Sequence, residues 1–161
     1  HERQRELESH LLLFYTGIPR FASEVAKTQI DNFRNRKKEL QAMGQMVPEA
    51  LSILGNNSVD IKEFGKLLNE SWKLKRSLSA SVTNKEIDEM YAAAIDQGAM
   101  GGKLLGAGGG GFLLIFAAKE NHKTIIGKLK NLLHVPMKFE RSGSRVLVYE
   151  PHEIARETES T

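Results

Sequence analysis

The sequence contains no cysteine. This absence excludes a disulfide framework, thiol catalysis and cysteine-held zinc, and it is compatible with the cytoplasm, where we expect the protein to reside. No segment approaches the run of about 18 apolar residues that a transmembrane helix requires, so we expect no membrane partner. The polar start does not resemble a signal peptide. It also lacks an initiator Met, which indicates a fragment or a chain that has lost residues.

Charge of one sign is not in strong excess. The formal net charge of +3 mildly favours anionic ligands, but it falls short of the basic character of nucleic-acid-binding proteins, so we expect no nucleic-acid partner. The densest basic run, residues 34–38, has no interleaved aromatic residues, and we interpret it as a solvated helix face. The five histidines are scattered and no HExxH motif is present, so we expect no metal ligands. GxSxG and Walker A motifs are also absent.

Glycine, in contrast, is concentrated in one stretch. Eight of the fourteen glycines lie between Gly98 and Gly111, directly before the apolar run 112–117. A flexible linker would also be rich in serine and polar residues, so these glycines belong inside a domain, beside a buried strand. A glycine-rich turn allows backbone N–H groups to converge on an anion, or allows close approach to another backbone. The competing interpretation is a crowded hairpin in which Gly108–Gly111 only relieve a steric clash.

Periodicity predicts a strand and then helices before this stretch. Residues 11–15 are an apolar run of strand length. Residues 21–54 follow a helical pattern, and Pro48 is expected to break it into two helices. A further helix has an apolar face that extends from residue 61 to residue 78.

The clearest helical pattern comes immediately before the glycine stretch. Thr83 and Glu86 have the spacing of a capping box at its start. Gly98 suits the C′ position at its end, where a left-handed backbone is needed. Lys103–Leu105 is then expected to be a short strand that enters the glycine turn.

Beyond the turn and its strand, the sequence predicts a helix and a hairpin. Asn121 is placed to cap a helix whose apolar face ends at Leu133. Residues 135–139 alternate in polarity, and residues 145–149 are expected to pair with them through a turn at Ser142–Gly143. This order of elements predicts an α+β domain with helices packed on an antiparallel sheet. We place this domain at residues 1–151, followed by a polar tail at residues 152–161.

The stretch Gly102–Gly111, followed by an apolar strand, resembles the third conserved motif of the GHMP kinases. The lysine, the Gly-Ala-Gly step and the strand all match that motif. Within this family, the segments Tyr15–Arg20, Trp72–Arg76 and Gly98–Lys103 are most similar to the kinases of D-glycero-D-manno-heptose 7-phosphate. The resemblance covers roughly residues 7 to 151 and corresponds to the C-terminal half of the family.

The resemblance implies a ferredoxin-like antiparallel sheet with several added helices, ATP and Mg²⁺ as cofactors, and phosphoryl transfer to a sugar hydroxyl. In the family, the main phosphate loop, the acidic residue that binds Mg²⁺ or activates the hydroxyl, and an assisting lysine lie in an N-terminal half. This chain contains no such half, so we expect no catalytic residue in it and no ATP turnover by the 161 residues alone. The expected partners are that N-terminal half and a sugar phosphate, and a homodimer is left open.

The same resemblance implies that the glycine turn supports the nucleotide-binding loop. The predicted cofactor-binding residues are Gly106, Ala107, Gly108, Gly109, Gly110 and Gly111. Polarity and placement predict the substrate contacts Thr16, Arg20, Lys75 and Arg76. Alternatively, the first two belong to an ordinary strand-to-helix turn, and the other two only complement a helix dipole. A second function is retained, a stand-alone ferredoxin-like domain that binds a small anion or regulates another protein.

Overall fold

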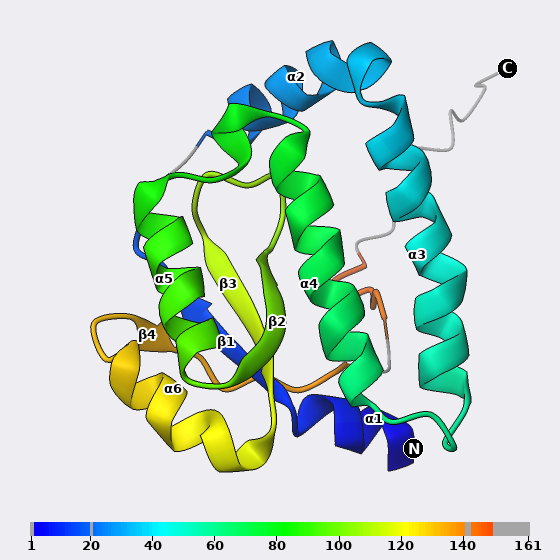
Figure 1. The fold of residues 1–161 in the computed structure, drawn as a ribbon, viewed down its shortest axis with the longest axis vertical. Coiled ribbons are helices and arrows are strands. Elements are labelled where there is room, and N and C mark those ends of the chain that lie inside the picture. Colours follow the sequence, from blue (N-terminus) through cyan, green and yellow to red (C-terminus); the bar gives the residue numbers. More distant parts are fainter. Residues whose placement is uncertain (1, 20, 141–142, 150–161) are drawn as a thin grey trace, which may run out of the picture.

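The structure is a computed structural model that describes residues 2–19, 21–140 and 143–149 (Figure 1). In this part of the chain, four antiparallel strands form one sheet with the order β2-β3-β1-β4. The strands are β1 (Leu11–Tyr15), β2 (Ala99–Leu104), β3 (Phe112–Ala117) and β4 (Leu133–His134). The predicted α+β class, with helices packed on an antiparallel sheet, is confirmed.

Helices surround this sheet. The α-helices are α1 (Glu2–Glu8), α2 (Ala22–Asn32), α3 (Lys37–Gly55), α4 (Lys62–Ser77), α5 (Lys85–Asp96) and α6 (His122–Lys128). Short 3-10 helices lie at η1 (Phe33–Asn35), η2 (Ala80–Val82) and η3 (Lys119–Asn121). Figure 1 shows α2 across the end of the molecule where β2 turns into β3, and α1 at the opposite end. Among the described residues, no helix is both long and apolar enough to cross a bilayer.

The first strand lies in the interior of the sheet, between β3 and β4. Its register with β3 runs from Leu11 opposite Phe116 to Tyr15 opposite Phe112. Because successive side chains of a strand point to opposite faces, the two faces of the sheet belong to two separate cores. The larger core contains Phe14, Trp72, Ile87, Leu113, Ile115 and Ile125, and the smaller one contains Leu7, Leu11, Ile61 and Phe116.

Helix α4 lies directly on the backbone of β2. A Cβ atom added to Gly101 would overlap the carbonyl oxygen of Gly65, and a Cβ added to Gly65 would lie 2.5 Å from the ring of Phe116. Glycine at both positions therefore permits contact between a helix backbone and a strand backbone. This close packing brings the C-terminal end of α4, with Lys75, beside the turn that follows β2.

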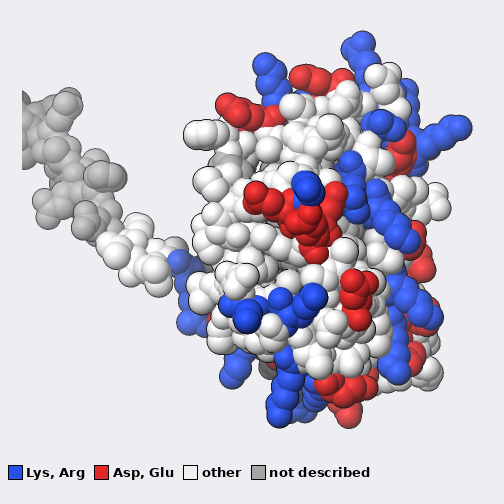
Figure 2. Space-filling view, turned by 60° about the vertical axis from the view of Figure 1, so that its left-hand side comes forward, with Lys and Arg blue, Asp and Glu red and all other residues white. Residues whose placement is uncertain are grey.

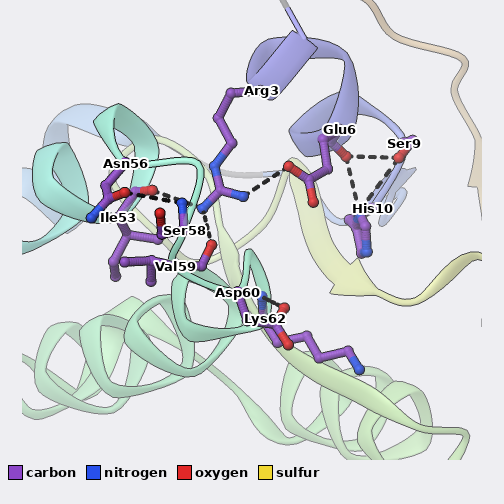
Figure 3. A network of polar contacts seen from close by, with 10 residues as sticks. All are labelled: Arg3, Glu6, Ser9, His10, Ile53, Asn56, Ser58, Val59, Asp60 and Lys62. Atoms are coloured by element: carbon purple, nitrogen blue, oxygen red, sulfur yellow. Dashed lines mark hydrogen bonds and ion pairs between the residues drawn. The ribbon is translucent and has the colours of Figure 1, made fainter.

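At the opposite end, Arg3 attaches α1 to the connection between α3 and α4 (Figure 3). One guanidinium nitrogen donates hydrogen bonds to the carbonyl oxygens of Ile53 and Val59 at 2.7 and 2.8 Å. The second terminal nitrogen forms an ion pair with Glu6 at 2.8 Å. Since the last carbonyl groups of a helix lack partners within the helix, Arg3 satisfies one such group near the end of α3.

The predicted break at Pro48 is wrong, because Pro48 lies inside an unbroken α3. Proline deprives the carbonyl group four residues earlier of its donor, and here that residue is Gly44. A Cβ on Gly44 would have no neighbour within 4 Å, so water can reach this side of the helix. The actual break between α2 and α3 lies at residues 33–36, where η1 replaces the α-helix.

Of two predicted helix caps, the one at Thr83 is wrong and the one at Asn121 is correct in position only. The N-cap of α5 is Asn84, whose side chain accepts a hydrogen bond from the amide of Ile87 at 2.9 Å. The Thr83 hydroxyl donates instead to Asp88 at 2.7 Å. Asn121 occupies the predicted N-cap position of α6, but its side chain makes no capping hydrogen bond, and its amide group donates to the carbonyl oxygen of Gly98 at 3.1 Å. In both cases a contact elsewhere occupies the predicted capping side chain.

Element lengths around the turn differ from the prediction as well. Strand β2 begins at Ala99 rather than Lys103, because its glycines are used in packing against α4. The left-handed backbone predicted at Gly98 is confirmed, with a φ of 88°. Helix α6 ends at Lys128, well before Leu133, which starts the two-residue strand β4.

The predicted C-terminal hairpin is wrong over the described residues. After Val135 donates to the carbonyl oxygen of Leu13, the chain leaves the sheet, and Phe139 donates its amide to the Glu8 carboxylate. Residues 135–140 and 143–149 contain no strand, and Leu147 is 91% exposed. Alternating polarity indicates one buried face, but it supplies no partner strand. Ser142, from the predicted turn, and the predicted tail at residues 152–161 lie outside the described residues.

Charged side chains of both signs are interspersed over the surface. On the face shown in Figure 2, acidic side chains gather in a central group, and basic side chains lie in several groups around it. The sign of the potential on this face therefore changes over short distances. Recognition of an anion would depend on individual basic groups and backbone amides here.

Candidate functional site

Residues 105–111, which we call the glycine turn, connect β2 to β3. The amide of Leu105 closes the turn by donating to the carbonyl oxygen of Phe112 at 2.8 Å. Four positions have positive φ angles that side chains disfavour. They are Gly106 (72°), Gly108 (117°), Gly109 (74°) and Gly111 (98°). The predicted turn into a buried strand is confirmed.

Two further contacts show why the turn excludes side chains. A Cβ atom on Gly108 would lie 2.6 Å from the carbonyl oxygen of Val82, and one on Gly110 would overlap the carbonyl oxygen of Ile18. The amide of Gly109 also donates to Val82 at 2.9 Å. Close backbone approach, one of the two uses expected for the glycines, is therefore confirmed within this domain, and the same contacts equally fit the competing interpretation of a crowded turn. Anion binding by the turn amides stays a prediction.

Thr16, at the end of β1, holds the last residue of the turn. Its buried hydroxyl donates to the carbonyl oxygen of Gly111 at 2.9 Å and lies 3.1 Å from the Gly111 amide, which donates to it. The backbone amide of Thr16 donates to the same carbonyl at 2.8 Å. These contacts join β1 to the start of β3. The predicted role of Thr16 in contacting substrate remains untested.

Lys75 holds the first part of the turn from α4. Its side chain is buried, and its ammonium group donates to the carbonyl oxygens of Leu104, at 3.2 Å, and Gly106. Because a buried ammonium group requires hydrogen-bond acceptors, these carbonyl groups compensate part of its desolvation. The structure thus brings Lys75 to the predicted glycine site, where it binds backbone oxygen atoms.

Gln29 completes this set of contacts from α2. Its side-chain amide donates to the carbonyl oxygen of Ala107 at 2.8 Å. Sequence reasoning did not single out Gln29, and nothing in the helical pattern around it distinguishes it from a surface residue. Side chains from three elements thus bind carbonyl groups in or next to the turn, whose residues 106–111 can offer a ligand only backbone groups and one methyl group.

Arg76 points away from the turn, although it is adjacent to Lys75 in the sequence. It forms an ion pair with Asp88 of α5 at 2.9 Å, and Asp88 also accepts the Thr83 hydrogen bond. About a third of the Arg76 side chain is exposed, and it lines a hollow of about 410 Å³ with Lys73, Ser77 and Thr83. Of the other predicted substrate contacts, Arg20 lies outside the described residues.

Two titratable groups near β2 have shifted pKa values because of burial. Burial raises the pKa of Tyr91 on α5 to about 12, and its hydroxyl donates to Asn69 of α4 at 2.7 Å. Burial lowers the pKa of Lys103, the lysine that precedes the turn. Tyr91 is thus a neutral hydrogen-bond donor at ordinary pH, and it fixes the packing of α5 on α4.

No metal centre is formed within residues 2–19, 21–140 and 143–149. No group of three or more histidine, aspartate or glutamate side chains is close enough there to hold an ion.

Comparisons with known proteins point to one family. Residues 54–135, about half of the chain, match the family model described as GHMP kinases C terminal. The chain is 32% identical over 128 residues to D-glycero-alpha-D-manno-heptose 7-phosphate kinase of Campylobacter jejuni. The aligned region covers 78% of this chain and 37% of the relative. The chain is also 31% identical over 116 residues to the bifunctional fucokinase/GDP-fucose pyrophosphorylase of Arabidopsis thaliana, covering 70% of this chain and 11% of the relative.

Solved structures agree with this fold. Mevalonate kinase of Methanococcus jannaschii superposes with a TM-score of 0.67 at 22% identity, covering 83% of this chain and 41% of that protein. The chain therefore spans less than half the length of each of these relatives. Together with the glycine turn and the antiparallel sheet that carries it, the match to the family model shows that this chain belongs to the GHMP kinase family, as its C-terminal domain.

Proposed function

We propose that this chain is the C-terminal domain of an ATP-dependent kinase that phosphorylates a hydroxyl of a sugar phosphate, and that this substrate is a heptose 7-phosphate. Family membership supports phosphoryl transfer, and the C. jejuni relative supports a heptose phosphate. The observation that carries the proposal is the fixed glycine turn. Phosphoryl transfer depends mainly on positioning and on stabilisation of charge, and a turn held by three side chains is already positioned before a ligand arrives.

The residues of the site have different roles in this proposal. Gly106–Gly111 support the nucleotide-phosphate loop of the N-terminal half by close backbone contact. Thr16 and Lys75 position this turn, since their polar atoms bind its carbonyl groups. Arg76 contacts the phosphate group of the substrate from the hollow beside α5. ATP and Mg²⁺ are the proposed cofactors, and Mg²⁺ is assigned to ligands outside the described residues.

An apolar patch beside the turn supports an N-terminal half as partner. Tyr15 and Phe112 lie opposite each other in the sheet, with ring centroids 5.3 Å apart, and each is 40% exposed. Leu133, opposite Tyr15 on the next strand, is 65% exposed. Three large apolar side chains on neighbouring strands are typical of a surface that another part of the protein covers. We therefore propose that the N-terminal half packs on this patch, and a second copy of the chain is the alternative occupant.

The direct test is ATP-dependent phosphorylation of heptose 7-phosphate by the full-length gene product, with the 161-residue chain assayed beside it. We expect activity in the long form only. Activity of the 161-residue chain alone would show that the chemistry does not need another half. If the long form phosphorylates neither this nor other sugars, the kinase proposal fails, and the anion-binding or regulatory domain becomes the better hypothesis.

A variant tests the role of Arg76 in the same assay. Arg76→Gln in the full-length protein should raise KM for the sugar phosphate about tenfold, because one charge-assisted hydrogen bond to phosphate is lost. Lys66→Gln is the matched control, since Lys66 lies on the same helix in an exposed ion pair with Glu63. Equal KM values for the two variants would remove Arg76 from the substrate site.

A further inference from the structure

Helix α2 lies next to the glycine turn with little apolar packing of its own. Val25 is its only buried residue. Ile30 is 60% exposed, and Phe21, which precedes the helix, is 75% exposed. Segments with few buried apolar contacts open at a lower free energy than the rest of a domain. The contacts that hold α2 in place are therefore mostly polar.

The first of these contacts is a group of three hydroxyls, which we call the hydroxyl cluster. Thr28 of α2 has its hydroxyl oxygen 2.9 Å from that of Ser79 and 2.5 Å from that of Ser81. The hydroxyls of Ser79 and Ser81 are 2.9 Å apart. A weaker contact follows at the end of the helix, where the Asn32 amide donates to the carbonyl oxygen of Leu78 at 3.3 Å.

Two connections join this part of α2 to the glycine turn, one through η2 and one through Gln29. Ser81 belongs to η2, whose last residue, Val82, accepts the amide hydrogen bond of Gly109 and lies against Gly108. Gln29, the neighbour of Thr28, binds Ala107 directly. One turn of α2 is thus bound to the glycine turn through Gln29 and to the element that supports the turn through Thr28.

The chain after α2 can act as a hinge. Before α2, Gly17 has a φ of 72° with open space around its Cβ position, but the next residue, Ile18, is packed on Gly110 of the glycine turn. After α2, the α-helical hydrogen-bond pattern stops at η1 and resumes at Lys37. Interruptions of this kind concentrate bending at a few residues.

We propose that α2 is a hinged cover for the glycine turn, closed by Gln29 and the hydroxyl cluster. When the cover opens, the turn loses the hydrogen bond to Ala107, so the order of the turn depends on the position of α2. That the covered turn serves a nucleotide rests on the proposed function, but the motion itself does not.

Amide hydrogen exchange of the 161-residue chain tests this proposal without any assay of activity. In the unmodified chain, amides of α2 should exchange about 100-fold faster than those of α4 and α5, since a local opening exposes them. Thr28→Val combined with Ser81→Ala should speed exchange of α2 and of residues 105–111 about tenfold, because hydrogen bonds of the closed form are lost. Ser77→Ala is the matched control, since that hydroxyl bonds only within α4, to Leu74.

The absence of cysteine allows the converse experiment. In the double variant Thr28→Cys, Ser81→Cys, a disulfide should hold the cover closed and slow exchange of α2 by about tenfold or more, and reduction of the same sample should reverse this. Comparing oxidised and reduced forms of one protein removes any effect of misfolding. Exchange of α2 at the rate of α4 and α5 in the unmodified chain would overturn the hinge. Faster exchange of α2 with no change in residues 105–111 would overturn its coupling to the turn.

Discussion

Two cations, the buried Lys75 and the largely buried Arg3, lie at opposite ends of the sheet, and each binds two backbone carbonyl groups. Lys75 binds Leu104 and Gly106 at the glycine turn, and Arg3 binds Ile53 and Val59 at the connection between α3 and α4. The chemistry is the same, but the structures that it holds differ. Arg3 fixes a helix end far from the turn, whereas Lys75 fixes a turn whose glycines are needed for close backbone contact.

The sequence around a cation is a poor guide to what the cation binds. Lys75 was a predicted substrate contact because basic residues cluster at the end of its helix, and Arg3 was not singled out because it lies in a polar segment at the start of the chain. In the structure both bind carbonyl groups, while Arg76, the neighbour of Lys75, faces a surface hollow. Neighbouring sequence therefore does not reveal which of two adjacent cations points inward.

A substitution within the glycine turn should have the largest effect on the free energy of unfolding. Gly108→Ala should lower the free energy of unfolding by more than about 3 kcal/mol, because it adds a disfavoured φ and a collision with the Val82 backbone. The matched control is Gly127→Ala, at an exposed position of α6 where an added Cβ meets nothing within 4 Å. This substitution should stabilise the protein by up to about 1 kcal/mol. Urea unfolding measures both. A loss below about 1 kcal/mol for the first variant would contradict a crowded turn.

Removing each cation in turn tests whether the two ends of the sheet depend on it in the same way. Lys75→Met and Arg3→Met should each cost about 2 to 3 kcal/mol, because carbonyl groups in buried or partly buried hydrogen bonds lose their donors. Only Lys75→Met should also speed hydrogen exchange at residues 105–111. The measurement is urea unfolding together with amide exchange of both variants. Equal exchange of the turn in the two variants would show that Lys75 is no more specific to the turn than Arg3.

A pH experiment tests the packing of α5 on α4, which lies between these two ends and depends on Tyr91. Burial raises the pKa of Tyr91 to about 12 in the folded protein, against about 10 in an unfolded chain. Between these two pH values Tyr91 loses its proton in the unfolded chain but keeps it in the folded one, which favours unfolding. The contribution of protonated Tyr91 to the free energy of unfolding is complete below pH 10 and is lost as the pH rises toward 12. From pH 9 to pH 11, the unmodified chain should lose about 1 kcal/mol more than Tyr91→Phe in urea unfolding. Parallel losses in the two proteins would show that Tyr91 is not buried as neutral phenol.

Much of the fold could be predicted because its signals are local. The apolar runs of β1 and β3 and the left-handed position of Gly98 depend on short stretches of sequence, and the structure contains all three. Asn84 replaced Thr83 as the cap of α5 because Asp88 accepts the Thr83 hydroxyl. That competition depends on the side-chain geometry around one particular helix, which spacing alone does not specify.

The site was predictable only in part, for a related reason. The glycines predict a turn, because few other residues tolerate its φ angles. Gln29, however, reaches Ala107 across 78 positions of sequence, and no local pattern specifies that contact. The hairpin predicted after Val135 is wrong for the same reason, since alternating polarity does not specify which strand a segment pairs with. The proposed contacts of Thr16, Lys75 and Arg76 with substrate, and of residues 106–111 with cofactor, remain predictions.

The pairing of β1 with β3 has a consequence for synthesis of the protein. Thr16 and Gly111, which bind each other, are 95 positions apart, and every residue of β1 pairs with a similarly distant one. At the usual speed of translation, a ribosome needs about 5 to 20 s to make the intervening chain. During that time the apolar segment Leu11–Tyr15 has no partner strand, so it is the part of the nascent domain that a chaperone would be expected to bind.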